Sequence, residues 1–111
     1  MVVAGDSPGG ALKLALAVSA GEVGLYLRAA LACISPWTDL AVTGESMRTK
    51  ARVDPCFTPE ACACRRASTC GDADPRHPLA SPLYDDLRGL PPVMVQVGDD
   101  ELLLDHARRL V

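Results

Sequence analysis

Runs of apolar residues predict three short β-strands in this chain. They cover residues 1–4, 28–34 and 92–97, and each run is followed within two residues by proline or glycine. The run at 28–34 is almost continuously apolar and is stopped by Ser35-Pro36. A run of that length and character favours a strand of a parallel sheet that is covered on both faces.

Helical patterns alternate with these strands. Residues 9–20 carry little charge and place Leu12, Ala15, Leu16 and Ser19 at helical spacing, so we expect a helix buried on most sides. A second helix should begin after Thr58, a favourable N-cap followed by proline and an acid, and should end at Gly71.

A third helix is expected at the end of the chain. Residues 98–101 should open it, and its apolar face would carry Leu103, Ala107, Leu110 and Val111. Residues 40–55 and 72–92 lack a sustained period and should be mainly loop. The alternation of strand and helix predicts the α/β class with a parallel sheet, in a single domain spanning residues 1–111.

Composition narrows the functional classes. The chain has 111 residues, 49% of them apolar, and a formal net charge of −3, which gives no basic surface for nucleic acid or an anionic membrane. No run approaches the roughly 18 apolar residues of a membrane helix, and no basic segment precedes an apolar core at the start. We therefore expect a soluble, cytoplasmic protein.

Five cysteines raise the alternative of a metal or redox module. They are Cys33, Cys56, Cys62, Cys64 and Cys70. An odd count without an export signal argues against a disulfide framework, and the spacings lack the close pairs of a zinc site. We therefore expect no metal and no cofactor; a metal module would instead reveal itself by stoichiometric zinc on purification.

The strongest chemical signal is the segment from Gly5 to Gly10. Here an apolar strand meets Gly-Asp-Ser-Pro-Gly, which fits the Gly-x-Ser-x-Gly pattern of a nucleophile elbow. Such a turn exposes a serine hydroxyl between a strand and a helix, so Ser7 is the candidate nucleophile. Gly5 and Gly9 would be needed because side chains there would collide where strand and helix nearly touch.

Further motifs follow the elbow in a fixed order. They are Ser35-Pro36-Trp37-Thr38-Asp39-Leu40, Asp54-Pro55, Ser81-Pro82-Leu83, Gly89-Leu90-Pro91-Pro92 and Gly98-Asp99-Asp100-Glu101. Together with residues 5–10 they make the chain resemble bacterial esterases of the hormone-sensitive lipase family, within the α/β-hydrolase fold. The resemblance covers essentially all 111 residues.

The resemblance implies a carboxylic ester hydrolase that acts on small esters with short acyl chains. It implies a Ser-Asp-His triad in which Ser7 is the nucleophile and Asp100 the acid, with Asp99 as the alternative. Gly5, Asp6, Pro8 and Gly9 would belong to the elbow and oxyanion region. Asp6 and Asp39 would support the site by hydrogen bonds, or would serve as capping and turn residues.

Three departures from the family pattern bear on activity. The family's histidine lies beyond the acid, after one more strand, and its His-Gly-Gly-Gly loop lies upstream; the sequence contains neither. We expect His106 and His77 to be solvated rather than catalytic. Pro8 stands where an oxyanion N–H is usually supplied, and proline has none; losing such a donor costs about 10²–10³ in kcat.

The chain therefore resembles a C-terminal-half segment of such an esterase, and we expect it to be inactive in isolation. The alternative is a non-catalytic, degenerate remnant of the fold, which Pro8 and the cysteines favour. In either case a sheet of about three parallel strands would have uncovered edges, and self-association through them is expected.

Overall fold

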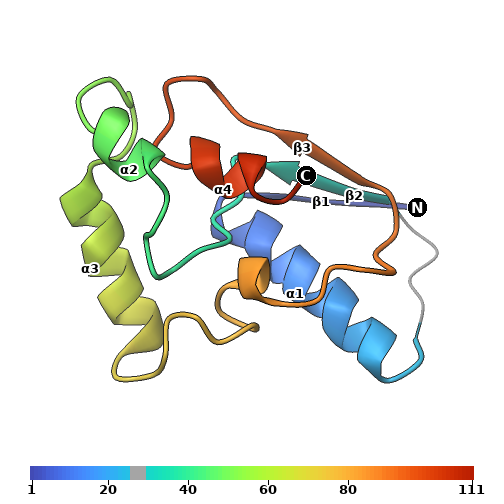
Figure 1. The fold of residues 1–111 in the computed structure, drawn as a ribbon. Coiled ribbons are helices and arrows are strands. Elements are labelled where there is room, and N and C mark those ends of the chain that lie inside the picture. The colour runs from blue at the N-terminus through green and yellow to red at the C-terminus, as the bar shows by residue number, and fades with distance from the viewer. Residues whose placement is uncertain (26–29) are drawn as a thin grey trace.

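The computed structural model describes residues 1–25 and 30–111, and its centre is a three-stranded parallel sheet (Figure 1). The strands β1 (Val2–Asp6), β2 (Ala30–Ile34) and β3 (Val93–Gln96) lie in that order. Val3 pairs with Leu31, and Leu31 with Val93. The predicted α/β class with three parallel strands is confirmed; residues 28 and 29 of the predicted second strand lie outside the described residues.

Helices follow each of the three strands along the chain. They are α1 (Pro8–Glu22), α2 (Ser46–Thr49), α3 (Pro59–Cys70) and α4 (Leu104–Arg108), with a 3-10 turn, η1, at Pro82–Tyr84. The start of α3 follows the sequence prediction, since the Thr58 hydroxyl accepts the N–H of Ala61 at 3.2 Å. The last helix is shorter than predicted, because residues 98–103 form turns and α4 begins only at Leu104.

One face of the sheet packs against α1. Leu14 and Ala17 of α1 contact Leu31 and Cys33 of β2. The predicted burial of α1 on most sides is wrong at Leu12 and Leu16, which are 63% and 55% exposed. Ala15 of the predicted set is buried, and so is Leu14. The cluster around this side of α1 also includes Val3 of β1, Val95 of β3 and Leu110.

The opposite face of the sheet is open, so the expectation of a sheet covered on both faces is wrong for the described residues. Val2, Ile34 and Met94 are exposed, whereas Leu31 and Cys33, which alternate with Ile34 along the chain, are buried. Because successive side chains of a strand point to opposite faces, this alternation marks one packed face and one open face.

A second apolar cluster lies beyond the carboxyl ends of the strands. It contains Trp37, Leu40, Met47, Cys62, Leu102 and Leu103. In Figure 1, α2, α3 and the start of α4 gather at this end of the sheet. The cluster joins the loops that follow β2 and β3, and it brings them beside the turn after β1. No helix within the described ranges is long and apolar enough to cross a membrane.

Candidate active site

Ser7 occupies the tight turn between β1 and α1. Its backbone angles are φ 48° and ψ −121°, and α1 begins at the next residue, Pro8. A positive φ is uncommon for a residue with a side chain and persists only where surrounding contacts hold it. The Ser7 N–H donates to the Ile34 carbonyl at 2.9 Å, and the Ser7 carbonyl accepts the Trp37 N–H at 3.0 Å. The strand–turn–helix geometry predicted from the sequence is therefore present.

The glycines of the turn are required unequally. A Cβ on Gly5 would stand 2.5 Å from the Gly9 carbonyl oxygen, so no side chain fits there. At Gly9 itself the expectation of a collision is wrong, since no described atom beyond its chain neighbours and its own helix backbone lies within 4 Å of an added Cβ. The second close approach is at Gly10, whose added Cβ would stand 3.0 Å from Cβ of Pro36. Strand and helix thus meet backbone to backbone at Gly5 and Gly9, and the side chain that must be missing is the one on the strand.

A pocket of about 230 Å³ opens beside Ser7. Its wall is formed by the last residues of β1 and β2 with the residues that follow them, the segment before α3 and the loop after β3. The lining residues are Asp6, Ser7, Ile34, Ser35, Asp54, Pro55, Cys56, Phe57 and Glu101. Such a concave space next to a serine on a strained turn is suited to bind a small substrate.

The acid that reaches this pocket from the loop after β3 is Glu101. The structure places neither Asp100 nor the alternative Asp99 in the pocket wall. The Asp100 side chain is 70% exposed, and its carboxylate pairs with Nζ of Lys50 at 3.2 Å. Glu101 Oε1 accepts the N–H of Gly98 at 2.8 Å, which closes the turn, and Glu101 lines the Ser7 pocket.

Asp54 joins two walls of the same pocket. One carboxylate oxygen accepts the N–H groups of Cys56 and Phe57 at 2.7 and 2.8 Å, and the other accepts the N–H of Leu102 at 2.7 Å. Partial burial alone would raise the pKa of Asp54, but the three backbone donors outweigh it and hold that pKa below its ordinary value. The group is therefore ionised at neutral pH.

His106 is fully buried, so the prediction of a solvated histidine is wrong. Its Nδ1 accepts the N–H of Asp39 at 3.2 Å, and its carbonyl accepts the Thr38 hydroxyl at 3.2 Å. Burial lowers the pKa of His106 to about 4, although the nearby Asp39 charge opposes this shift. His77 is exposed as predicted, and neither histidine lines the Ser7 pocket.

Asp39 acts as a turn residue rather than as a neighbour of Ser7. Its buried carboxylate accepts the N–H groups of Ala41 and Thr43, the hydroxyl of Tyr84 at 3.0 Å and a guanidinium N–H of Arg109 at 3.1 Å. Burial would raise the pKa of Asp39, but the hydrogen bonds from Thr43 and Tyr84 lower it overall. Asp6, by contrast, is exposed and lines the pocket.

The cysteines do not converge. All five are free thiols, and burial raises the pKa of both Cys33 and Cys62, which disfavours their thiolate forms. Within residues 1–25 and 30–111, no group of three or more cysteine, histidine or acidic side chains lies close enough to hold a metal ion.

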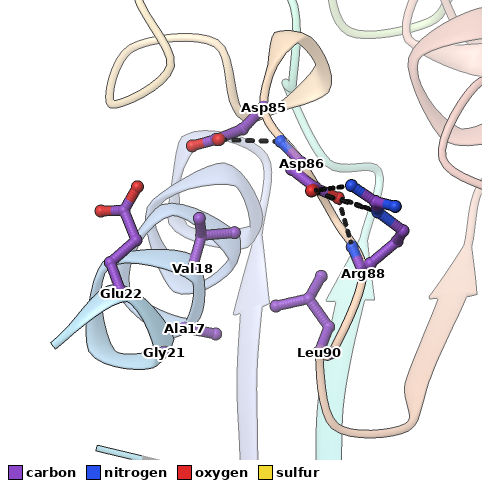
Figure 2. Close-up of a pocket in the computed structure, with 9 residues that line it drawn as sticks. Ala17, Val18, Gly21, Glu22, Asp85, Asp86, Arg88 and Leu90 are labelled. Carbon is purple, nitrogen blue, oxygen red and sulfur yellow. Dashed lines mark hydrogen bonds and ion pairs between the residues drawn. The ribbon is translucent and has the colours of Figure 1, made fainter. Parts of the chain in front are cut away.

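A second cavity, of about 360 Å³, lies along the C-terminal half of α1 (Figure 2). Its wall includes Ala17, Val18 and Leu90. Two of its charged side chains, Asp86 and Arg88, form an ion pair at 2.6 Å. Ser7 precedes the opposite end of α1, and no residue of the Ser7 pocket contributes to this cavity.

Comparison with known proteins gives a consistent result. A family described as alpha/beta hydrolase fold matches residues 1–111. The acetyl-hydrolase of Streptomyces hygroscopicus is 46% identical over 111 residues, covering 99% of this chain and 37% of that protein. The putative acetyl-hydrolase LipR of Mycobacterium tuberculosis is 46% identical over 105 residues, covering 94% of this chain and 34% of that protein.

Solved structures agree with these sequence matches. The crystal structure of an esterase from the bacterial hormone-sensitive lipase family has a TM-score of 0.94 and 49% identity, covering 98% of this chain and 37% of that one. A crystal structure of EstE5 soaked with p-nitrophenyl butyrate has a TM-score of 0.92 and 43% identity, covering 98% of this chain and 36% of that one. The chain thus spans about a third of the length of the relatives it matches.

Proposed function

The chain belongs to the alpha/beta hydrolase fold family, and on that premise we propose that residues 1–111 carry the nucleophile and the acid of a serine carboxylic ester hydrolase. The substrates are small esters with short acyl chains, and no cofactor is used. The observation that carries the proposal is the position of Ser7, on a strained strand-to-helix turn that opens into the pocket shared with Glu101.

In the proposed mechanism the Ser7 hydroxyl attacks the ester carbonyl and gives its proton to a histidine base. A serine hydroxyl is a poor nucleophile without such a base, and a histidine suits the task because its pKa lies near neutrality. His77 and His106 do not line the Ser7 pocket, so these 111 residues do not supply the base. The chain alone is therefore inactive.

We assign the triad acid to Glu101 in place of Asp100. The acid must orient the histidine and stabilise the imidazolium, so it has to face the same space as the nucleophile. Glu101 lines the Ser7 pocket, whereas the carboxylate of Asp100 is engaged by Lys50. A glutamate serves this role as an aspartate does in other α/β-hydrolases.

Pro8 weakens the proposed oxyanion hole and supports a second candidate, a non-catalytic remnant of the fold. Pro8 is the first residue of α1, where its fixed φ suits the helix, but it has no N–H to donate to an oxyanion. The loss of one such donor costs about 10²–10³ in kcat. An esterase built on this segment would therefore be slow.

The test is to place residues 1–111 in the Streptomyces hygroscopicus acetyl-hydrolase, in exchange for the segment they match, and to measure p-nitrophenyl butyrate hydrolysis. We expect turnover that Ser7→Ala abolishes and that Ser19→Ala, in the last turn of α1, leaves unchanged. Pro8→Ala should raise kcat by about 10²-fold if the missing donor is limiting. A folded graft with no Ser7-dependent turnover, even with Pro8→Ala, supports the remnant instead.

A matched pair tests the acid in the same graft. Glu101→Gln should lower kcat by roughly 10⁴-fold, by analogy with the loss when a triad carboxylate becomes an amide. Asp100→Asn should change kcat less than about twofold, because an exposed ion pair contributes little. If Asp100→Asn lowered kcat more than Glu101→Gln, the triad acid would be Asp100 instead.

A further inference from the structure

We infer that Asp54 is a positioning residue that holds Glu101 at the Ser7 pocket; this inference rests on the proposed function. Asp54 is far from Glu101 in the sequence, since it lies in the segment between α2 and α3. Its carboxylate nevertheless accepts the N–H of Leu102, the residue joined to Glu101 by a peptide bond, at 2.7 Å.

Leu102, whose N–H binds the Asp54 carboxylate, is itself held firmly in place. The Leu102 side chain is fully buried, and its carbonyl accepts the hydroxyl of Ser46 at 2.6 Å. Both polar groups of the Leu102 backbone are thus held by side chains from the segment between β2 and α3. The Glu101–Leu102 peptide cannot shift unless one of these hydrogen bonds breaks.

The same carboxylate also fixes the facing wall. Its other oxygen accepts the N–H groups of Cys56 and Phe57, both of which line the pocket with Glu101. Hydrogen bonds to an ionised acceptor are roughly twice as strong as neutral ones. Asp54 therefore sets the distance between the loop at 54–57 and the loop at 98–102, and with it the place of the Glu101 carboxylate relative to Ser7.

This role predicts a particular kinetic pattern in the graft described above. Asp54→Asn preserves size but can accept through only one oxygen, so one of the two attachments is lost. We expect kcat to fall about tenfold or more with KM nearly unchanged, because an error of about 1 Å in a catalytic group can cost about 10²-fold. The control Asp86→Asn, an exposed acid that does not line the pocket, should change neither constant.

A double-mutant cycle separates positioning from general support of the fold. If Asp54 acts through Glu101, Asp54→Asn should lower kcat less than about twofold in a Glu101→Gln background. If it merely supports the fold, the loss is the same in both backgrounds, and the inference is overturned. The pH profile gives a second readout, since a displaced carboxylate lowers the pKa of the histidine base and moves the acid limb of kcat/KM to lower pH.

Amide hydrogen exchange on the 111-residue chain tests the same inference without activity. Asp54→Asn should raise the exchange rate of the Leu102 amide at least tenfold while the amides of β2 keep their protection. Unchanged exchange at Leu102, or an equal rise throughout the chain, would overturn the inference. An inactive graft would instead count against the proposed function, so the two failures are distinguishable.

Discussion

At the scale of single residues, the turn that carries Ser7 depends on a missing side chain at Gly5 far more than at Gly9. The two glycines flank the serine symmetrically in the motif, yet only Gly5 stands against backbone, with the Gly9 carbonyl 2.5 Å from an added Cβ. Backbone atoms cannot rotate away as the end of a flexible side chain can. The motif is symmetrical in sequence but not in its physical requirements.

This asymmetry gives a paired prediction for stability. Gly5→Ala should lower the free energy of unfolding by about 1–3 kcal/mol, the usual cost of forcing extra atoms into a packed site. Gly9→Ala should leave it unchanged or raise it by up to about 1 kcal/mol, since alanine is favoured over glycine within a helix. Urea unfolding of the 111-residue chain measures both. Equal losses in the two variants would contradict the asymmetry.

Whether the sequence could identify a site residue depended on how far along the chain its contacts lie. Ser7 was predictable because its strained turn is encoded by neighbours within a few positions. Glu101 was not, since three consecutive acids at 99–101 all fit the spacing. Their directions depend on the Glu101 bond to Gly98 and on Asp54, which lies 48 positions from Leu102. A contact between distant segments leaves no local signal.

At the scale of elements, α4 illustrates how tertiary contacts override a local pattern. The sequence predicted a longer helix with an exposed histidine, whereas α4 has five residues and buries His106 against the loop after β2. A helix this short is unstable by itself. It is held by the hydrogen bonds from Thr38 and Asp39 to His106 and by the Arg109 bond to Asp39.

The attachment of α4 should make stability depend on pH. The pKa of His106 is about 4 when folded and 6.5 ordinarily, so between these values the unfolded chain binds more protons. Stability should therefore fall as pH drops from about 6.5 to about 4, by roughly 3 kcal/mol in total. Burial lowers this pKa most, the nearby charge of Arg109 lowers it further, and the charges of Asp39 and Asp105 oppose the shift.

Unfolding midpoints at pH 7 and pH 5 test this dependence. The wild-type chain and the control His77→Gln, whose histidine is exposed, should lose stability between these values. His106→Gln should be less stable at pH 7 but should lose much less on acidification. The range stays above the ordinary pKa of aspartate, so protonation of Asp39 does not contribute. A His106→Gln variant with the wild-type slope would assign the dependence to another group.

At the scale of the whole molecule, the sequence predicted three parallel strands but not what covers them. Alternating strands and helices favour a parallel sheet by connection length alone, and that prediction is confirmed. Burial of the second face could not be deduced in the same way. Ile34 and Met94 are exposed although both lie in apolar strands. An apolar run indicates that a strand would be stabilised by burial, but it does not show which segment, if any, covers it.

This open face and the edges at β1 and β3 lead to the last prediction, that the isolated chain self-associates. Unpaired edge strands and contiguous apolar surface favour contacts between copies. Sedimentation velocity should show a coefficient that rises with protein concentration. Met94→Lys places a charge on β3, where the methionine is 58% exposed, and should reduce this rise.

The control variant Ala63→Lys adds the same charge on the exposed side of α3 and should leave this rise unchanged. Equal effects of the two lysines would mean that net charge, rather than the sheet, governs association; a wild-type chain that stays monomeric at all concentrations would contradict the prediction itself.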